Sequence, residues 1–223
     1  MNLRHLCLMM VVSMFAVLPM MAQTTDDAAR HEAQMKKLKK GLNEKSVKAA
    51  RKEVKRLEKN GWETAPGTLP MDKQLERSYL YQEQLDENME PAYITVTVTA
   101  IGENYIAAKK QAEAIMKPTL AGKIQSNVTE IIENTVSTKQ LAPGEAASVV
   151  QTLSQSKEII SQELGSMITI VDLFRTLKNG NKEVSITCAY SMTKAKQVAK
   201  DVVKKELEKG NSDLQKKWDD IEL

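Results

Sequence analysis

Alternating apolar and polar residues predict the first strand along the chain. In ITVTVTA, residues 94–100, isoleucine and valine alternate with threonine, which is typical of a strand with one buried face. Two further strand patterns cover residues 166–177 and 183–192 and are joined through Asn179-Gly180. Asn-Gly between two such runs is the strongest short-range signal for a two-residue type I′ hairpin turn. The pattern therefore predicts a small, mainly antiparallel sheet of three strands.

Helical periodicity accounts for most of the remaining chain. The longest run, residues 103–138, places Leu120, Ile124 and Val128 on one stripe, and we expect Pro118 to kink or divide this helix. Shorter helices are predicted at residues 26–42, 45–60, 70–85, 146–164 and 193–209, with a last one around Trp218 whose indole packs back. The predicted fold class is α+β: the three-stranded sheet is covered by long helices, with an N-terminal helical segment.

Breaks in these patterns, such as APGTLP at residues 65–70, divide the chain into five parts. The predicted parts are a signal peptide (1–22), a basic helical hairpin (23–61), a linker and helix (62–92), an α+β core domain (93–210) and a C-terminal tail helix (211–223).

The first 22 residues have the three-part pattern of a secretory signal peptide. Arg4 precedes an apolar run from Leu6 to Leu18, and Pro19 and Ala22 follow it. The run is shorter than the roughly 20 residues that a spanning helix needs, although an uncut N-terminal anchor is the alternative. We expect cleavage after Ala22, no transmembrane segment in the mature chain, and a protein that is periplasmic or exported to the cell envelope surface. The Met-rich leader followed by glutamine resembles exported proteins of Bacteroides-type bacteria.

Charge is distributed unevenly along the chain. Residues 30–59 contain twelve basic and four acidic side chains, a net of +8, whereas residues 61–223 contain nineteen basic and twenty-three acidic ones, a net of −4. The basic segment has three interpretations: contact with an anionic envelope polymer, self-association with an acidic stretch such as 83–90 of a neighbour, or a solvated helix face. It lacks interleaved aromatic residues, so no nucleic acid is expected. The candidate contact residues are Lys36, Lys37, Lys39, Lys40, Lys48, Arg51, Lys52, Lys55 and Arg56.

Cys188 is the one cysteine that would remain after cleavage, in VSITCAY at residues 184–190. With a two-residue turn at 179–180, the predicted register places Val171 opposite Cys188 and Leu173 opposite Ile186. All of these side chains would then share the buried face, where a free thiol packs as a small hydrophobic group. The same register puts Asp172 on the opposite face, near Thr187. The remaining histidine, His31, lies far away in the chain, so the thiol has no predicted base.

No pattern in the chain matches a known catalytic, cofactor or metal motif. One histidine and one cysteine do not make a structural zinc set, and single glycines do not make a phosphate loop. We therefore expect no catalytic residue, no cofactor and no metal. The predicted function is that of a non-catalytic exported envelope protein acting through protein–protein contact or assembly. The alternatives are a binder of an anionic envelope polymer and, third, an enzyme of unrecognised type.

Residues 94–209 resemble a family of envelope proteins in the order of their elements. The order is strand, long helix, second helix, two strands and helix, carried by AAKKQAEAIMKPTLAGKIQSNV, SQELGSMITIVDLFRT and EVSITCAYSM. It resembles the lipoprotein domain typified by the twenty-kilodalton Helicobacter antigen, and the N-terminal domain of flagellar assembly protein T. The resemblance implies an α+β envelope module without known catalysis, and it carries no functional residue over. The chain departs from that family in having no lipobox cysteine and an extra basic segment.

Overall fold

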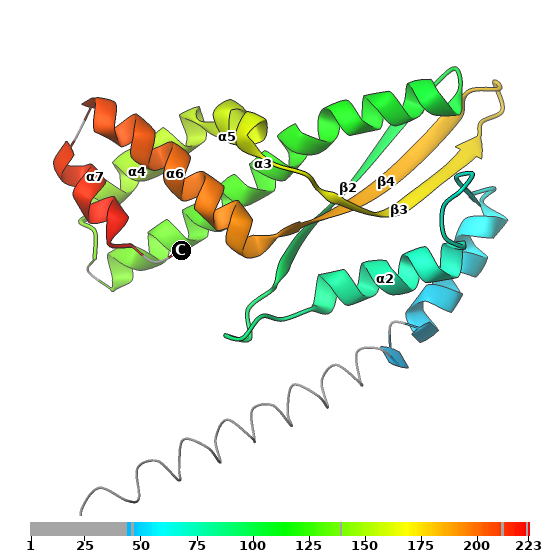
Figure 1. The fold of residues 1–223 in the computed structure, drawn as a ribbon, viewed down its shortest axis with the longest axis horizontal. Helices are drawn as coiled ribbons and strands as arrows, with labels where there is room; N and C mark the ends of the chain where they lie inside the picture. Colours follow the sequence, from blue (N-terminus) through cyan, green and yellow to red (C-terminus); the bar gives the residue numbers. More distant parts are fainter. Residues whose placement is uncertain (1–43, 46, 139, 211, 222) are drawn as a thin grey trace, which may run out of the picture. The chain divides into compact units, whose positions relative to one another are not determined.

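A computed structural model describes residues 44, 45, 47–138, 140–210, 212–221 and 223 (Figure 1). From Lys45 to Leu223 they form one compact unit. The predicted signal peptide and the first helix of the predicted basic hairpin lie outside the described residues, and so do Lys36, Lys37, Lys39 and Lys40.

The centre of this unit is an antiparallel sheet with the strand order β1-β3-β4-β2. The strands are β1 (Glu63–Thr64), β2 (Tyr93–Gly102), β3 (Ile168–Thr176) and β4 (Lys182–Ser191). The predicted α+β class is confirmed, and the three predicted strands are present. The prediction missed β1, a two-residue strand at the edge, because so short a segment carries no periodicity.

The turn between β3 and β4 has three residues rather than the predicted two. The amide of Leu177 donates to the carbonyl of Asn181 at 2.8 Å, and the amide of Gly180 donates to the carbonyl of Leu177 at 2.9 Å. Gly180 has a φ of +87°, the left-handed conformation that glycine adopts without steric cost. A tight turn closed by a left-handed glycine is the usual three-residue hairpin loop. The loop is therefore Lys178–Gly180, and the predicted register is wrong by one residue.

The corrected register reassigns the faces of β3. Val171 pairs with Thr187 and Asp172 pairs with Ile186, while an irregularity between Thr169 and Val171 leaves Thr169 opposite Cys188. Because side chains alternate along a strand, Val171 lies on the face opposite Cys188. Asp172 lies on the same face as Cys188, which reverses the prediction for both residues.

Helices cover both faces of the sheet (Figure 1). They are α2 (Met71–Glu83), α3 (Tyr105–Ser137), α4 (Pro143–Gln155), α5 (Lys157–Glu163), α6 (Met192–Gly210), α7 (Ser212–Asp219) and an unlabelled helix at residues 47–59. Pro118 is exposed and does not divide α3, whereas the single helix predicted over 146–164 is divided at Ser156. No helix in the described part of the chain is both long and apolar enough to cross a membrane.

Two apolar clusters fill the space between these layers. The larger one lies between α3 and the Cys188 face of the sheet and continues between α3, α4, α5, α6 and α7, where Trp218 is fully buried. The smaller one packs Ala50, Met71 and Leu75 against Val171 and Leu173 on the other face. The short last helix with an inward-facing Trp218 is thus confirmed.

Candidate functional site

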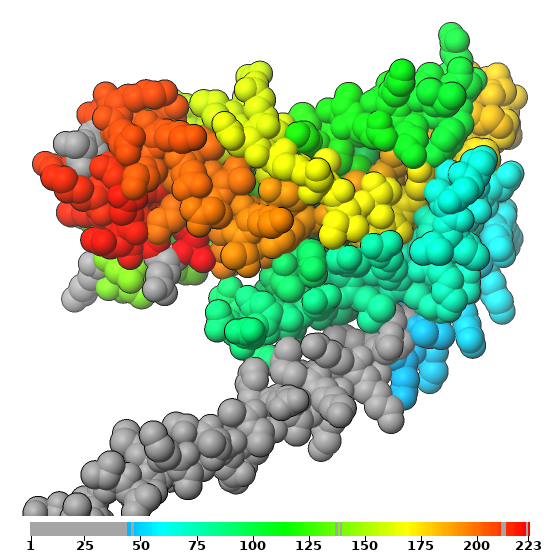
Figure 2. All heavy atoms as spheres, in the orientation of Figure 1, coloured from blue at the N-terminus to red at the C-terminus, as the bar shows by residue number. Residues whose placement is uncertain are grey.

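A cavity of about 490 Å³ lies where α3, the edge of β3 and the segment leading into α2 meet. In the space-filling view, β3 residues (yellow) reach the surface between α3 (green) and the α2 segment (cyan) (Figure 2). Four of the lining residues are charged, namely Arg77, Lys109, Glu113 and Asp172. Apolar side chains, among them those of Leu69, Met116, Met167 and Ile186, also line it. A mixture of apolar wall and few charged groups is typical of small-molecule sites.

Asp172 is the most buried charged residue of the cavity, with 3% of its surface exposed. Its Oδ2 accepts hydrogen bonds from the Lys109 Nζ at 2.6 Å and from the Tyr105 hydroxyl at 2.9 Å. Its backbone amide donates to the Gln74 Oε1 at 2.7 Å, which ties α2 to the edge of β3. Its Oδ1 is buried and accepts no hydrogen bond from any residue that the structure describes. Buried carboxylate oxygens are normally paired, so this oxygen is the exception that needs an explanation.

Lys109 balances the charge of Asp172. Burial lowers the pKa of Lys109, but its hydrogen bonds to Asp172 and Tyr105 raise it more, so the net pKa lies above the ordinary lysine value. Burial, together with the Asp172 charge, also raises the pKa of Tyr105. Both groups therefore stay protonated at neutral pH, and they hold one oxygen of Asp172 in place.

Cys188 lines the same cavity but remains buried, with 6% of its surface exposed. Burial raises the pKa of its thiol, and the Thr169 hydroxyl lies 3.6 Å from the sulfur. The prediction of a buried cysteine is confirmed, although its partners differ: Val96 pairs with it from β2, and Val171 points to the other face. The thiol form, which is a poor nucleophile, therefore dominates at neutral pH.

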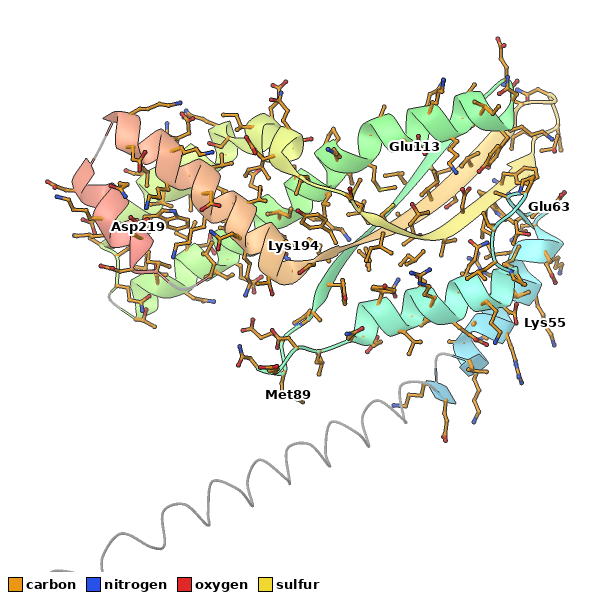
Figure 3. The ribbon with its side chains drawn as sticks, in the orientation of Figure 1. Lys55, Glu63, Met89, Glu113, Lys194 and Asp219 are labelled. Carbon is orange, nitrogen blue, oxygen red and sulfur yellow. The ribbon has the colours of Figure 1, made fainter. Side chains whose placement is uncertain are left out.

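The predicted polyanion-contact residues that the structure describes lie on the helix at residues 47–59. They are Lys48, Arg51, Lys52, Lys55 and Arg56, and all five are exposed (Figure 3 labels Lys55). Arg56 is paired with Glu53. The other side of this helix buries Ala50. None of the five lines the Asp172 cavity, so they form a separate basic surface.

The outer edge of β2 is a third feature. Within the described part of the chain, β2 pairs with β4 alone. The Met192 amide donates to the Ala92 carbonyl, so the even-numbered residues of β2 direct their backbone amides and carbonyls toward β4. The backbone groups of the odd-numbered residues Thr95, Thr97, Thr99 and Ile101 therefore point outward. Lys123 donates to the Thr95 carbonyl at 2.8 Å, whereas Thr97, Thr99 and Ile101 are exposed. The open part of the edge is therefore Thr97–Ile101.

Comparison of the chain with protein-family models, with curated proteins and with solved structures found no match. The resemblance of residues 94–209 to the envelope lipoprotein domain therefore stays a prediction. Among the residues that the structure describes, no three histidine, cysteine, aspartate or glutamate side chains are grouped as metal ligands would be.

Sequence reasoning missed the cavity because its charged residues come from distant segments. Lys109 and Asp172 are 63 residues apart, and the wrong register placed Asp172 on the other face of the sheet. One signal was present in the sequence: Asp172 interrupts the otherwise apolar run IVDLF, residues 170–174, which is unusual for a buried strand.

Proposed function

We propose that this chain is a non-catalytic exported envelope protein that works through protein–protein contact, and that its first partner is a second copy of itself. The open edge of β2 carries this proposal. A sheet edge with unpaired amides and carbonyls is a template for another strand. Natural edges are usually protected by charges or proline, yet Tyr93–Gly102 contains neither.

Residues 97–101 suit pairing with an identical strand. In an antiparallel arrangement with Thr99 on the two-fold axis, each Thr97 faces an Ile101 and the two Thr99 residues face each other. The three pairs use outward-pointing backbone groups, so each can exchange two hydrogen bonds. A neutral strand meets no like charge in its copy. Pairing would also cover Ile101, which is 48% exposed.

A lysine at position 99 tests this proposal. In the dimer, Thr99→Lys would place two ammonium groups directly opposite each other, which destabilises a strand pair. We expect light scattering after size exclusion to show a dimer for the wild type and a monomer for T99K. Thr138→Lys adds the same charge at the exposed C-terminal end of α3 and should leave the dimer intact. A wild-type chain that is monomeric at all concentrations would overturn the proposal.

The exposed basic surface of the helix at residues 47–59 favours a second function, binding of an anionic envelope polymer. Lys48, Lys52 and Lys55 follow one another at spacings of four and three residues, so they lie along one side of the helix. Among the described residues, none of these three lysines forms an ion pair. A row of exposed cations raises the local concentration of a polyanion.

Heparin, as a soluble polyanion, measures this second function. We expect its binding to weaken steeply as salt rises and to weaken several-fold in the triple variant K48A/K52A/K55A. The control K110A/K194A/K205A removes the same charge from exposed positions on α3 and α6 and should bind like the wild type. Equal losses of heparin affinity in both variants, or heparin binding that salt does not change, would contradict this second function and leave the three lysines as a solvated helix face.

A further inference from the structure

The Asp172 cavity holds an unsatisfied acceptor beside an unpaired acid. Asp172 Oδ1 has no donor in the described part of the chain, and Glu113, labelled on α3 in Figure 3, lines the cavity without an ion pair to any described residue. Burial is the main cause of the raised pKa of Cys188, and the charges of Glu113 and Asp172 add to it. Glu113, Asp172 and Cys188 all line the same cavity. Because Lys109 already balances one negative charge, this side of the cavity keeps a net charge of −1.

The opposite side of the cavity is provided by the α2 segment and is basic. Arg77 lines the cavity, and its guanidinium carbon lies 5.5 Å from the centroid of the Tyr81 ring. Arg77 makes no ion pair with any residue in the described ranges. A cation from α2 and an anion from α3 thus line the same cavity, and neither forms an ion pair with a described residue.

Apolar residues complete the wall between these two charged sides. Met116 and Ile186 are buried, whereas Leu69 at the α2 side is 51% exposed. An exposed leucine at the rim and flexible methionines in the wall suit an apolar ligand. The cavity volume of about 490 Å³ falls in the range of small-molecule pockets.

We propose that this cavity binds a small zwitterion with an apolar body, of the size of a dipeptide. Its ammonium group donates to Asp172 and Glu113, its carboxylate accepts from Arg77, and its apolar side chains lie against Leu69, Met116 and Met167. The charged ends give orientation, while the apolar wall gives affinity for aliphatic side chains. This cavity and the β2 edge would serve different functions, and neither proposal depends on the other.

Calorimetric titration of the full chain with L-leucyl-L-leucine tests the proposal. Two blocked probes separate the poles: the N-acetyl dipeptide lacks the ammonium, and the dipeptide amide lacks the carboxylate. We expect the free dipeptide to bind and each blocked form to bind about tenfold more weakly or worse, because a hydrogen bond to a charged group is worth at least that factor.

Variants at Glu113 and Arg77 assign each charged end of the ligand to its residue. Glu113→Gln should weaken the free dipeptide about tenfold and leave the residual affinity of the N-acetyl form unchanged, because that ligand no longer meets Glu113 with a charge. Arg77→Gln should likewise weaken binding of the free dipeptide about tenfold. It should leave the residual affinity of the dipeptide amide unchanged, because that ligand has no carboxylate to meet Arg77. Glu130→Gln, an exposed acid further along α3, is the matched control. The absence of heat with the free dipeptide, or equal binding of all three probes, would overturn the proposal.

Discussion

Trp218→Ala should lower the free energy of unfolding by about 3–5 kcal/mol, the range for removing a large buried aromatic side chain. Trp218 is fully buried in the cluster formed by α3, α4, α6 and α7. Its indole Nε1 donates to the Lys200 carbonyl at 3.1 Å, so the substitution removes a hydrogen bond along with the packing. Chemical denaturation followed by circular dichroism measures the loss.

The control for this prediction is on the same helix. The Lys216 side chain is 75% exposed, and its ion pair at 3.5 Å is with Asp213, whose side chain is 91% exposed, so Lys216→Ala should change stability by about 0.5 kcal/mol or less. A loss of comparable size in both variants would mean that α7 as a helix, rather than the indole, stabilises the unit. A small loss in Trp218→Ala would contradict the assigned packing of the C-terminal helix.

The strands and helices were predictable because their periodicity depends on burial. The alternation in ITVTVTA placed Ile94, Val96 and Val98 on one face, and the structure buries all three. The apolar stripe of Leu120, Ile124 and Val128 likewise faces the core. Such patterns are long, and each residue adds to the same signal.

The register of the β3–β4 hairpin was not predictable from the Asn-Gly signal alone. Asn179-Gly180 fits both a two-residue turn and the end of a three-residue loop, because glycine tolerates the left-handed conformation in either. Choosing the shorter turn shifted β3 by one residue, which moves the side chains from Val171 to Thr176 to the other face, as far as the irregularity between Thr169 and Val171. Cys188 kept its buried position, since the β2–β4 face is fixed by Val96 and Ile186 whichever way β3 pairs.

The Asp172 cavity illustrates the same limit in the candidate site. Its members come from α2, α3, β3 and β4, and they meet only when the correct register brings Asp172 under α3. Local pattern has no information about such long-range contacts. The isolated acid in an apolar strand was the one sequence feature that pointed to it.

Lys109→Met should lower the free energy of unfolding at neutral pH by about 3 kcal/mol, the lower end of the range for leaving a buried charge without its partner. The lower end applies because about a third of the Lys109 side chain, 34%, is exposed, so water compensates in part. Asp172, whose side chain is 4% exposed, would keep only the Tyr105 hydroxyl as a donor. Urea denaturation measures the change, and Lys110→Met at the next, exposed position should stay within about 0.5 kcal/mol of the wild type.

Two further measurements show whether the charge of Asp172 causes the loss. Adding Asp172→Asn to the Lys109→Met chain should recover part of the stability, because the buried charge is then gone; a double variant no more stable than the single one would point to lost packing instead. The second measurement is pH. The pKa of Lys109 is raised in the folded state, so its stabilisation is complete below the ordinary lysine pKa of about 10.4 and is lost as the pH rises through the folded-state value. The stability difference between wild type and Lys109→Met should therefore shrink with rising alkalinity, and a difference that stays constant would show that the ion pair does not contribute.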